Sequence, residues 1–173
     1  MKLLIDRFPS PIGEVLLVSD GQNLRALDFW DYEARMHQLL RLHYGSYALQ
    51  PARNPAGVSA LIEQYMNGDL EVIAAIPVET GGTPFQKEVW AALRTIPLGR
   101  TISYGTLALQ IKRPKAVRAV GMANGANPVS IVVPCHRVIG SNGALTGYGG
   151  GLQRKRWLLN HESMEIQPQL ALA

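Results

Sequence analysis

The apolar residues near the start of the chain form short runs separated by turn-forming residues. Residues 14–19 are a mainly apolar run, and residues 24–30 are a mixed, largely apolar one. The sequence DGQN between them favours a tight turn between antiparallel strands. Residues 2–8 alternate less regularly. The pattern predicts a β-hairpin or a meander over residues 1–30.

Two later segments carry apolar residues at spacings of three and four, which is typical of helices that bury one face. These segments are residues 32–44 and 57–67, and Asn67-Gly68 would end the second helix. The stretch ETGG at residues 79–82 has the composition of a linker. We therefore expect an N-terminal α/β domain at residues 1–80, with an antiparallel sheet and a structural role.

Residues 81–173 are expected to form a mostly helical domain, which places the whole chain in the α+β class. Thr83 can cap a helix that begins at Pro84, and Gln86 completes a capping box. Two further helices are predicted at residues 103–110 and 115–124, with a basic turn between them. Their length and order predict a helix-turn-helix.

The second helix of that pair, KAVRAVGMAN, consists mostly of small or apolar residues. Few of its side chains can hydrogen-bond to base edges, so it cannot carry much sequence code. Its small residues would instead let the backbone approach DNA closely, as in the minor groove. For some positions the alternative is packing against a neighbouring helix.

The last part of the chain combines an apolar run with a basic helix. Residues 131–133 are expected to form a buried strand that stops at Pro134, so that Cys135 is presented at a strand end. A basic amphipathic helix is predicted at residues 152–161, with Glu162 following it. From residue 163 onward we expect a loosely ordered tail.

Composition and charge narrow the class of protein. The chain has 173 residues, 47% of them hydrophobic, and its first apolar run is too short for a signal peptide. No 18 apolar residues run together, so we expect a cytoplasmic protein that makes no membrane contact. Residues 81–162 hold eleven lysines and arginines but two acidic residues, whereas the rest of the chain holds six lysines and arginines and eleven acidic residues. This asymmetry favours a nucleic-acid partner over a membrane surface.

Cys135 is the single cysteine, which excludes an internal disulfide and a cysteine-rich zinc site. No metal site is expected, since His37 and His43 lack the spacing that places two ligands on one helix face. Cys135 is either packing or a nucleophile. His136 and Arg137 could lower the pKa of its thiol or take its proton, and Glu162 could orient the histidine.

Three short motifs give the chain a resemblance to a known family. They are Asn127-Pro128, Pro134-Cys135-His136-Arg137-Val138 and Gly147-Tyr148-Gly149-Gly150. In their helix-turn-helix context they resemble the O6-alkylguanine-DNA alkyltransferases over about residues 83–162. Residues 1–80 resemble more weakly the N-terminal domain of the bacterial single-function members. The resemblance implies direct-reversal DNA repair, in which a methylated-DNA–protein-cysteine methyltransferase moves an alkyl group irreversibly to its own cysteine in one turnover.

The resemblance also implies roles for the residues of the reaction. Cys135 would be the alkyl acceptor, and His136 would be its base through a bridging water, held by Glu162. The target nucleotide must leave the helix before the thiolate can attack. Tyr104 would support this flipping and hydrogen-bond to the base, and Arg118 would fill the vacated stack.

The resemblance also implies that further residues bind the DNA and the flipped base. Asn127 would tie the helix-turn-helix to the cysteine turn, and Tyr148 would form a wall of the pocket. The Gly149 N–H would face guanine O6, while the carbonyls of Cys135 and Val138 would accept from the exocyclic amine. Lys115 and Ala119 would lie in the DNA-contacting helix. Taken singly, Tyr104 could be a core tyrosine, Arg118 a phosphate contact and Glu162 a surface acid.

The partner implied is double-stranded DNA that carries O6-alkylguanine, with O4-alkylthymine left open. No cofactor and no obligate protein partner are expected, and the chain is expected to be a monomer. Alkyltransferase-like binding proteins lack the cysteine that is present here, and a transcription regulator would need a more polar recognition helix. The adaptive-response relatives carry N-terminal cysteines that this chain does not have.

Overall fold

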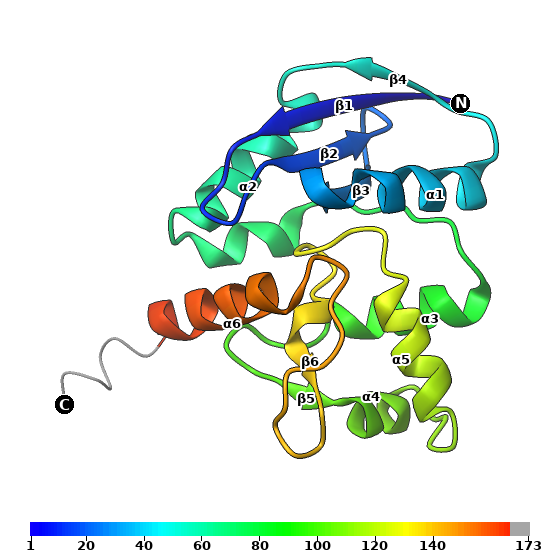
Figure 1. The fold of residues 1–173 in the computed structure, drawn as a ribbon, viewed down its shortest axis with the longest axis vertical. Helices are drawn as coiled ribbons and strands as arrows, with labels where there is room; N and C mark the ends of the chain where they lie inside the picture. Colours follow the sequence, from blue (N-terminus) through cyan, green and yellow to red (C-terminus); the bar gives the residue numbers. More distant parts are fainter. Residues whose placement is uncertain (167–173) are drawn as a thin grey trace. The chain divides into compact units, whose positions relative to one another are not determined.

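The computed structural model describes residues 1–166 and forms two compact units, drawn as ribbons in Figure 1. The first unit is Met1–Gly82 together with Pro128–Val132, and the second holds Thr83–Asn127 and the chain from Val133 onward. The expected domains of residues 1–80 and 81–173 stay a prediction. The units differ from them because residues 128–132 belong with the first unit. No helix in the described part of the chain is long and apolar enough to cross a membrane.

The first unit is built on the predicted meander. Strands β1 (Lys2–Phe8), β2 (Val15–Ser19) and β3 (Leu24–Phe29) pair antiparallel in chain order. Asp20 organises the turn between β2 and β3, because its Oδ1 accepts hydrogen bonds from the backbone N–H groups of Gln22 and Asn23 at 2.8 and 2.7 Å. The turn chemistry and the hairpin pairing are therefore as the sequence predicts.

A fourth strand, β4 (Ala48–Pro51), extends the sheet and is absent from the sequence prediction. It pairs parallel to β1, so the strand order is β3-β2-β1-β4 and the sheet is mixed rather than wholly antiparallel. Most of its side chains are exposed, so no alternation of apolar and polar residues marks it. The α+β fold class is confirmed.

Two helices complete the first unit, with short 3₁₀ segments η1 (Trp30–Tyr32), η2 (Pro55–Gly57) and η3 (Leu70–Ala75). Helices α1 (Glu33–Tyr44) and α2 (Val58–Met66) agree with the predicted ones within a residue or so. One core cluster joins α1 to the sheet through Leu3, Ile5, Leu16, Val18, Ala26, Met36 and Leu40. This apolar layer explains why α1 lies along the sheet.

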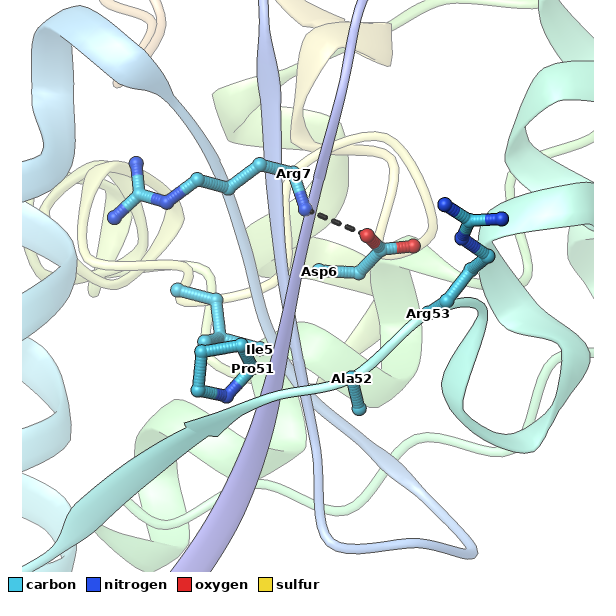
Figure 2. A pocket seen from close by; sticks show the side chains of 6 residues that line it. All are labelled: Ile5, Asp6, Arg7, Pro51, Ala52 and Arg53. Carbon is cyan, nitrogen blue, oxygen red and sulfur yellow. Dashed lines mark hydrogen bonds between the residues drawn. The ribbon is translucent and has the colours of Figure 1, made fainter.

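A hollow of about 420 Å³ lies beside β4 and is shown in Figure 2. It is lined by Ile5, Asp6, Arg7, Pro51, Ala52 and Arg53. The Asp6 carboxylate accepts from the backbone N–H groups of Arg7 and Asn54 and from the Ser59 hydroxyl, at 2.8, 3.0 and 2.6 Å. These bonds use the carboxylate to join β1 to the segment before α2, which is a structural role.

The second unit begins with the predicted capped helix, α3 (Pro84–Leu93). The Thr83 side chain accepts from the Gln86 N–H at 3.1 Å, and the Gln86 side chain accepts from the Thr83 N–H at 3.0 Å. Val89, Trp90 and Leu93 are buried, as the pattern indicates. Strands β5 (Ile102–Ser103) and β6 (Val138–Ile139) form a short parallel pair in the same unit.

The helix-turn-helix consists of α4 (Tyr104–Gln110) and α5 (Val117–Gly125). Ser103 caps α4 by accepting from the Thr106 N–H at 3.0 Å, and Lys112 turns the chain with a left-handed φ of 61°. Helix α5 begins two residues later than predicted. The Trp90 indole donates to the Ala123 carbonyl at 2.8 Å, which fixes α5 against α3.

The predicted strand at residues 131–133 is wrong. These residues are buried but form a turn, and Ile131 has a φ of 73° that is incompatible with an extended ladder. Short apolar runs do not distinguish a strand from a buried turn. Cys135 consequently lies not at a strand end but in η4 (Cys135–Arg137), a 3₁₀ turn that leads into β6.

The last helix, α6 (Leu152–Ile166), is longer than predicted. Glu162 lies within this helix, whereas it was expected to follow the helix. Residues 163–166 of the expected loose tail are therefore helical, and the remainder of that tail lies outside the described residues. One face of α6 is buried and holds Lys155, Leu158 and Glu162, spaced at i, i+3 and i+7. This face contacts η4.

Candidate active site

Cys135 is held in the first position of η4 by its own backbone. Its N–H donates to the Val133 carbonyl at 2.8 Å, and the Val138 N–H donates back to the Cys135 carbonyl. Pro134 precedes it with a φ of −81°, which is the value its ring favours. The cysteine is 3% exposed, so its surroundings are set by the protein rather than by bulk water.

The next two residues both bind one carboxylate. His136 Nε2 lies 2.9 Å from Glu162 Oε2, and Arg137 donates from Nε to Oε1 and from Nη2 to Oε2, each at 2.9 Å. Arg137 also donates from Nη1 to the Ile96 carbonyl at 2.7 Å. Arg137 therefore pairs bidentately with Glu162, and α6 is joined to the cysteine turn through three buried side chains.

Burial and charge set the protonation of this group. Burial lowers the pKa of His136, and the attraction of Glu162 opposes this only in part, so the imidazole is neutral at pH 7. Burial alone would raise the pKa of Glu162, but the charges and hydrogen bonds of His136 and Arg137 hold it well below its ordinary value. An ionised Glu162 accepts, so the ring proton lies on Nε2 and Nδ1 is an acceptor.

Nδ1 of His136 is buried and has no hydrogen-bond partner among the residues that the structure describes. A buried acceptor of this kind can receive a proton from a thiol, directly or through one water. The Tyr148 ring meets the imidazole edge-on, with the centroids 6.5 Å apart. Tyr148 thus lies against His136, and Gly149 next to it is half-buried.

Two asparagines join the end of α5 to the cysteine turn. Asn127 is buried and donates from Nδ2 to the Val133 carbonyl at 2.8 Å. Asn124 is buried on α5 and donates from Nδ2 to the Cys135 carbonyl at 3.5 Å. Asn127 thus bonds to the segment before Cys135, while its role in the site stays a prediction, and Asn124 adds a second link that the sequence did not indicate.

Lys155 is the functional candidate that the sequence prediction missed. Its side chain is fully buried, and Nζ donates to the carbonyls of Val138, Thr146 and Gly147 at 2.6, 2.7 and 3.3 Å. Burial lowers its pKa to about 8, and the charge of a Cys135 thiolate would raise it. The signal was its spacing from Leu158 and Glu162, which places a lysine on the buried face of α6.

Tyr104 begins α4 and extends toward the loop before α6. Its hydroxyl donates to the Thr146 carbonyl at 3.0 Å and accepts from the Thr146 hydroxyl at 3.4 Å. A Cβ at Gly121 would lie 3.8 Å from the Tyr104 ring, so α5 passes close to it. Tyr104 is therefore neither deep core nor isolated, and it lies between α5 and the loop that carries Tyr148.

The remaining predicted residues lie on the outer face of the helix-turn-helix. Lys115, Arg118 and Ala119 are exposed, and the Arg118 side chain makes no hydrogen bond or ion pair within the described part of the chain. The structure thus gathers Cys135, His136 and Glu162 into one buried group. It leaves Arg118 of α5 on the surface, together with Lys115, which lies in the turn before α5 and not in the helix as predicted; a large anion can reach both.

Comparison with known proteins agrees with this arrangement. The model of the 6-O-methylguanine DNA methyltransferase DNA-binding domain matches residues 84–164, and that of the ribonuclease-like domain of the same protein matches residues 4–80. A methylated-DNA–protein-cysteine methyltransferase of Salmonella typhimurium is 54% identical over 165 residues, which cover 94% of this chain and 96% of that one. One from Haemophilus influenzae is 42% identical, over 91% and 84% of the two chains.

Solved structures give the same result. The O6-methylguanine methyltransferase of Mycobacterium tuberculosis is similar with a TM-score of 0.80 and 40% identity, over 98% of each chain. A structure titled as the Mycobacterium tuberculosis OGT in complex with DNA has a TM-score of 0.79 and 40% identity, over 95% of this chain and 94% of that one.

Fold and site together define the class of helix-turn-helix proteins that carry a cysteine beside a buried histidine–glutamate pair. The chain belongs to the 6-O-methylguanine DNA methyltransferase family. This confirms the family that the cysteine motif indicated, together with the predicted fold class. It also confirms the activity at the level of DNA repair by alkyl transfer to a cysteine, with DNA as the partner.

Proposed function

We propose that Cys135 accepts the alkyl group of O6-alkylguanine in double-stranded DNA, once per molecule. The observation that carries this proposal is the buried Cys135–His136–Glu162 group, which lies in the same unit as the exposed Arg118 of α5. Cys135 is also the chain's single thiol. Thiolates are stronger nucleophiles toward alkyl carbon than the other side chains in this group.

The proton of the thiol passes to Nδ1 of His136, directly or through one water. Glu162 accepts from Nε2 and stabilises the imidazolium that forms, as in other nucleophile–base–acid groups. Arg137 keeps Glu162 ionised and fixed in place. A lysine ammonium at Lys155 adds positive charge that favours the thiolate.

The transfer step is a displacement at the alkyl carbon. The Cys135 Sγ–carbon bond forms while the carbon–O6 bond breaks, and the guanine takes the electron pair and then the proton that His136 received from the thiol. The Tyr104 hydroxyl, which donates to the Thr146 carbonyl, turns to donate to the base as charge develops on it. The carbon–sulfur bond of the product thioether is not hydrolysed by acid–base chemistry, so the protein is consumed after one event.

The base must leave the stack to reach Cys135, and the outer face of α5 supports this movement. Arg118 enters the vacated position, and Lys115 and the small Ala119 allow the helix to lie close to the duplex. The flipped guanine is read by the carbonyls of Cys135 and Val138 and by the Gly149 N–H, with Tyr148 as a wall. The Val138 carbonyl accepts from Lys155 Nζ, whereas the Cys135 carbonyl accepts from the Val138 N–H and from Asn124 Nδ2. The exocyclic amine therefore takes the place of the long 3.5 Å bond from Asn124 at Cys135.

The reaction requires no cofactor, and we propose that a monomer in the cytoplasm carries it out. The test is incubation with duplex DNA that contains O6-methylguanine, followed by mass spectrometry of the peptide with Cys135. One methyl mass on that peptide, and at most one transfer per protein, is the expected result. Cys135→Ser should bind the same DNA and transfer nothing. Repeated turnover, or a methyl group on another residue, would contradict the proposal.

A further inference from the structure

Three exposed residues of α5 share one face of the helix. Arg118, Ala119 and Met122 are exposed, and Met122 follows the other two by four and three residues. Lys115 is exposed in the turn that precedes α5. The opposite face is buried through Val120, Ala123 and Asn124, which pack inside the second unit. Met122 thus follows Arg118 by one helical turn on the outward face.

Met122 has the most exposed large apolar side chain among the described residues. It is 77% exposed, compared with 74% for Leu42 and 63% for Leu109. An apolar side chain so exposed contributes little to the folding of the unit, and water favours its removal from the surface. It is therefore free to be buried by a partner.

The charges around Met122 indicate which partner this is. Helix α5 has no acidic residue, its exposed face carries Arg118, and Lys115 is exposed in the turn that precedes it. A neutral protein surface would gain nothing from these cations, whereas the phosphates on both sides of a DNA groove would. Methionine is also one of the apolar residues that minor-groove proteins press between or against bases.

We propose that Met122 is an apolar wedge that packs against sugars and base edges in the DNA minor groove, beside the position that Arg118 enters. This inference rests on the proposed function, because it assumes that α5 faces the duplex. Four residues of helix span about 6 Å, so Met122 reaches a neighbouring nucleotide rather than the vacated one. Its contact supports the opened groove while the target base is outside the stack.

The experiment compares Met122→Ala with the wild-type protein. Alanine is a good helix former at an exposed position, so the variant should fold normally, which circular dichroism and thermal unfolding can verify. We expect Met122→Ala to bind a dye-labelled duplex about tenfold more weakly, because the apolar contact is lost. The dependence of affinity on salt should be unchanged, because no cation is removed. Met122→Leu should restore most of the affinity.

Two comparisons make the assignment specific. Leu42→Ala removes an equally exposed apolar chain from α1 and should leave binding at the wild-type level. Alkyl transfer from a single-stranded O6-methylguanine oligonucleotide, which has no minor groove, should be affected much less than transfer from the duplex. Wild-type binding and transfer by Met122→Ala, or equal losses on both substrates, would overturn the inference. Absence of transfer by the wild-type protein would instead overturn the proposed function.

Discussion

His136 Nε2 lies 2.9 Å from an oxygen of Glu162 that Arg137 Nη2 also approaches at 2.9 Å. One buried carboxylate on α6 therefore fixes both residues that follow Cys135. The arrangement determines which imidazole nitrogen is available to the thiol. It also makes the orientation of the base depend on a helix that is distant in sequence.

Replacing Glu162 with Gln tests this dependence. The amide keeps the shape but removes the charge that holds Arg137 and His136, which leaves a buried guanidinium without its counter-ion. We expect the free energy of unfolding to fall by about 3 kcal/mol. The single-turnover rate of methyl transfer should fall at least about a hundredfold, because a positioned base contributes on that order.

Glu88→Gln is the matched control for that change. Glu88 pairs with Arg113 at 3.1 Å, but both side chains are about half exposed to solvent. Such pairs contribute little to stability, so urea unfolding and transfer by this variant should stay near wild type. A wild-type transfer rate in Glu162→Gln would show that the carboxylate does not act on the base.

The lowered pKa of His136 predicts a specific dependence of stability on pH. The unfolded chain binds a proton at this residue near its ordinary pKa of 6.5, whereas burial keeps the folded imidazole neutral to lower pH. The unfolded state thus binds more protons, and stability must fall as the pH falls below 6.5. Glu162, whose folded pKa lies below its ordinary 4.5, adds a further loss below that value.

Urea unfolding as a function of pH measures this effect, with His136→Asn as the comparison. The variant has no imidazole at this position, so its stability should decline less between about pH 6.5 and 5. The other three histidines are common to both proteins and cancel in the difference. Equal slopes for the two proteins would mean that His136 titrates normally in the fold.

Lys155→Met tests the buried lysine. Methionine is similar in length but leaves the carbonyls of Val138, Thr146 and Gly147 without their donor. We expect a loss of about 1–3 kcal/mol in the free energy of unfolding and faster amide exchange in the loop at residues 141–149. Transfer should slow, since that loop carries Tyr148.

Arg156→Met is the control for this lysine. It removes a neighbouring cation on the exposed face of α6, and the Arg156 side chain makes no hydrogen bond or ion pair within the described residues. Exchange in the loop should then match wild type. Equal effects of both substitutions would attribute the change to net charge rather than to the three carbonyls.

Local chemistry explains which parts of the fold could be predicted. The turn at Asp20, the capping box at Thr83 and the order of α4 and α5 depend on neighbouring residues, so the sequence shows them. Strand β4 depends on pairing with β1, more than forty residues away, and its exposed side chains have no alternation. The turn at Ile131 depends on a left-handed backbone conformation, and an apolar side chain does not indicate such a conformation.

The candidate site likewise contains residues that the sequence indicates and residues that it does not. The motif at Cys135 indicates the nucleophile and the base, and Glu162 was predicted from its place after the basic helix as the acid that orients the histidine. Arg137 was predicted to act on the thiol, but it is engaged with Glu162 and Ile96, which only the packing of α6 decides. Lys155 was not predicted as a site residue, because a lysine in a basic helix is usually solvated. Its burial depends on carbonyls from β6 and the loop that follows β6.

Salt dependence of DNA binding tests the exposed face of α5. Arg118 and Arg53 are both exposed arginines, on α5 and on the segment after β4 respectively. If Arg118 contacts the duplex, Arg118→Ala should weaken binding to undamaged DNA and reduce the slope of log affinity against log salt by about one. Arg53→Ala removes the same single charge from the protein. It should leave the slope at the wild-type value, because the loss of Arg53 alters only the long-range electrostatic field, which salt screens. Fluorescence anisotropy over a series of salt concentrations gives both slopes. Equal slopes for Arg118→Ala and the wild-type protein would remove Arg118 from the interface, and a reduced slope for Arg53→Ala would extend the DNA-binding surface to the first unit.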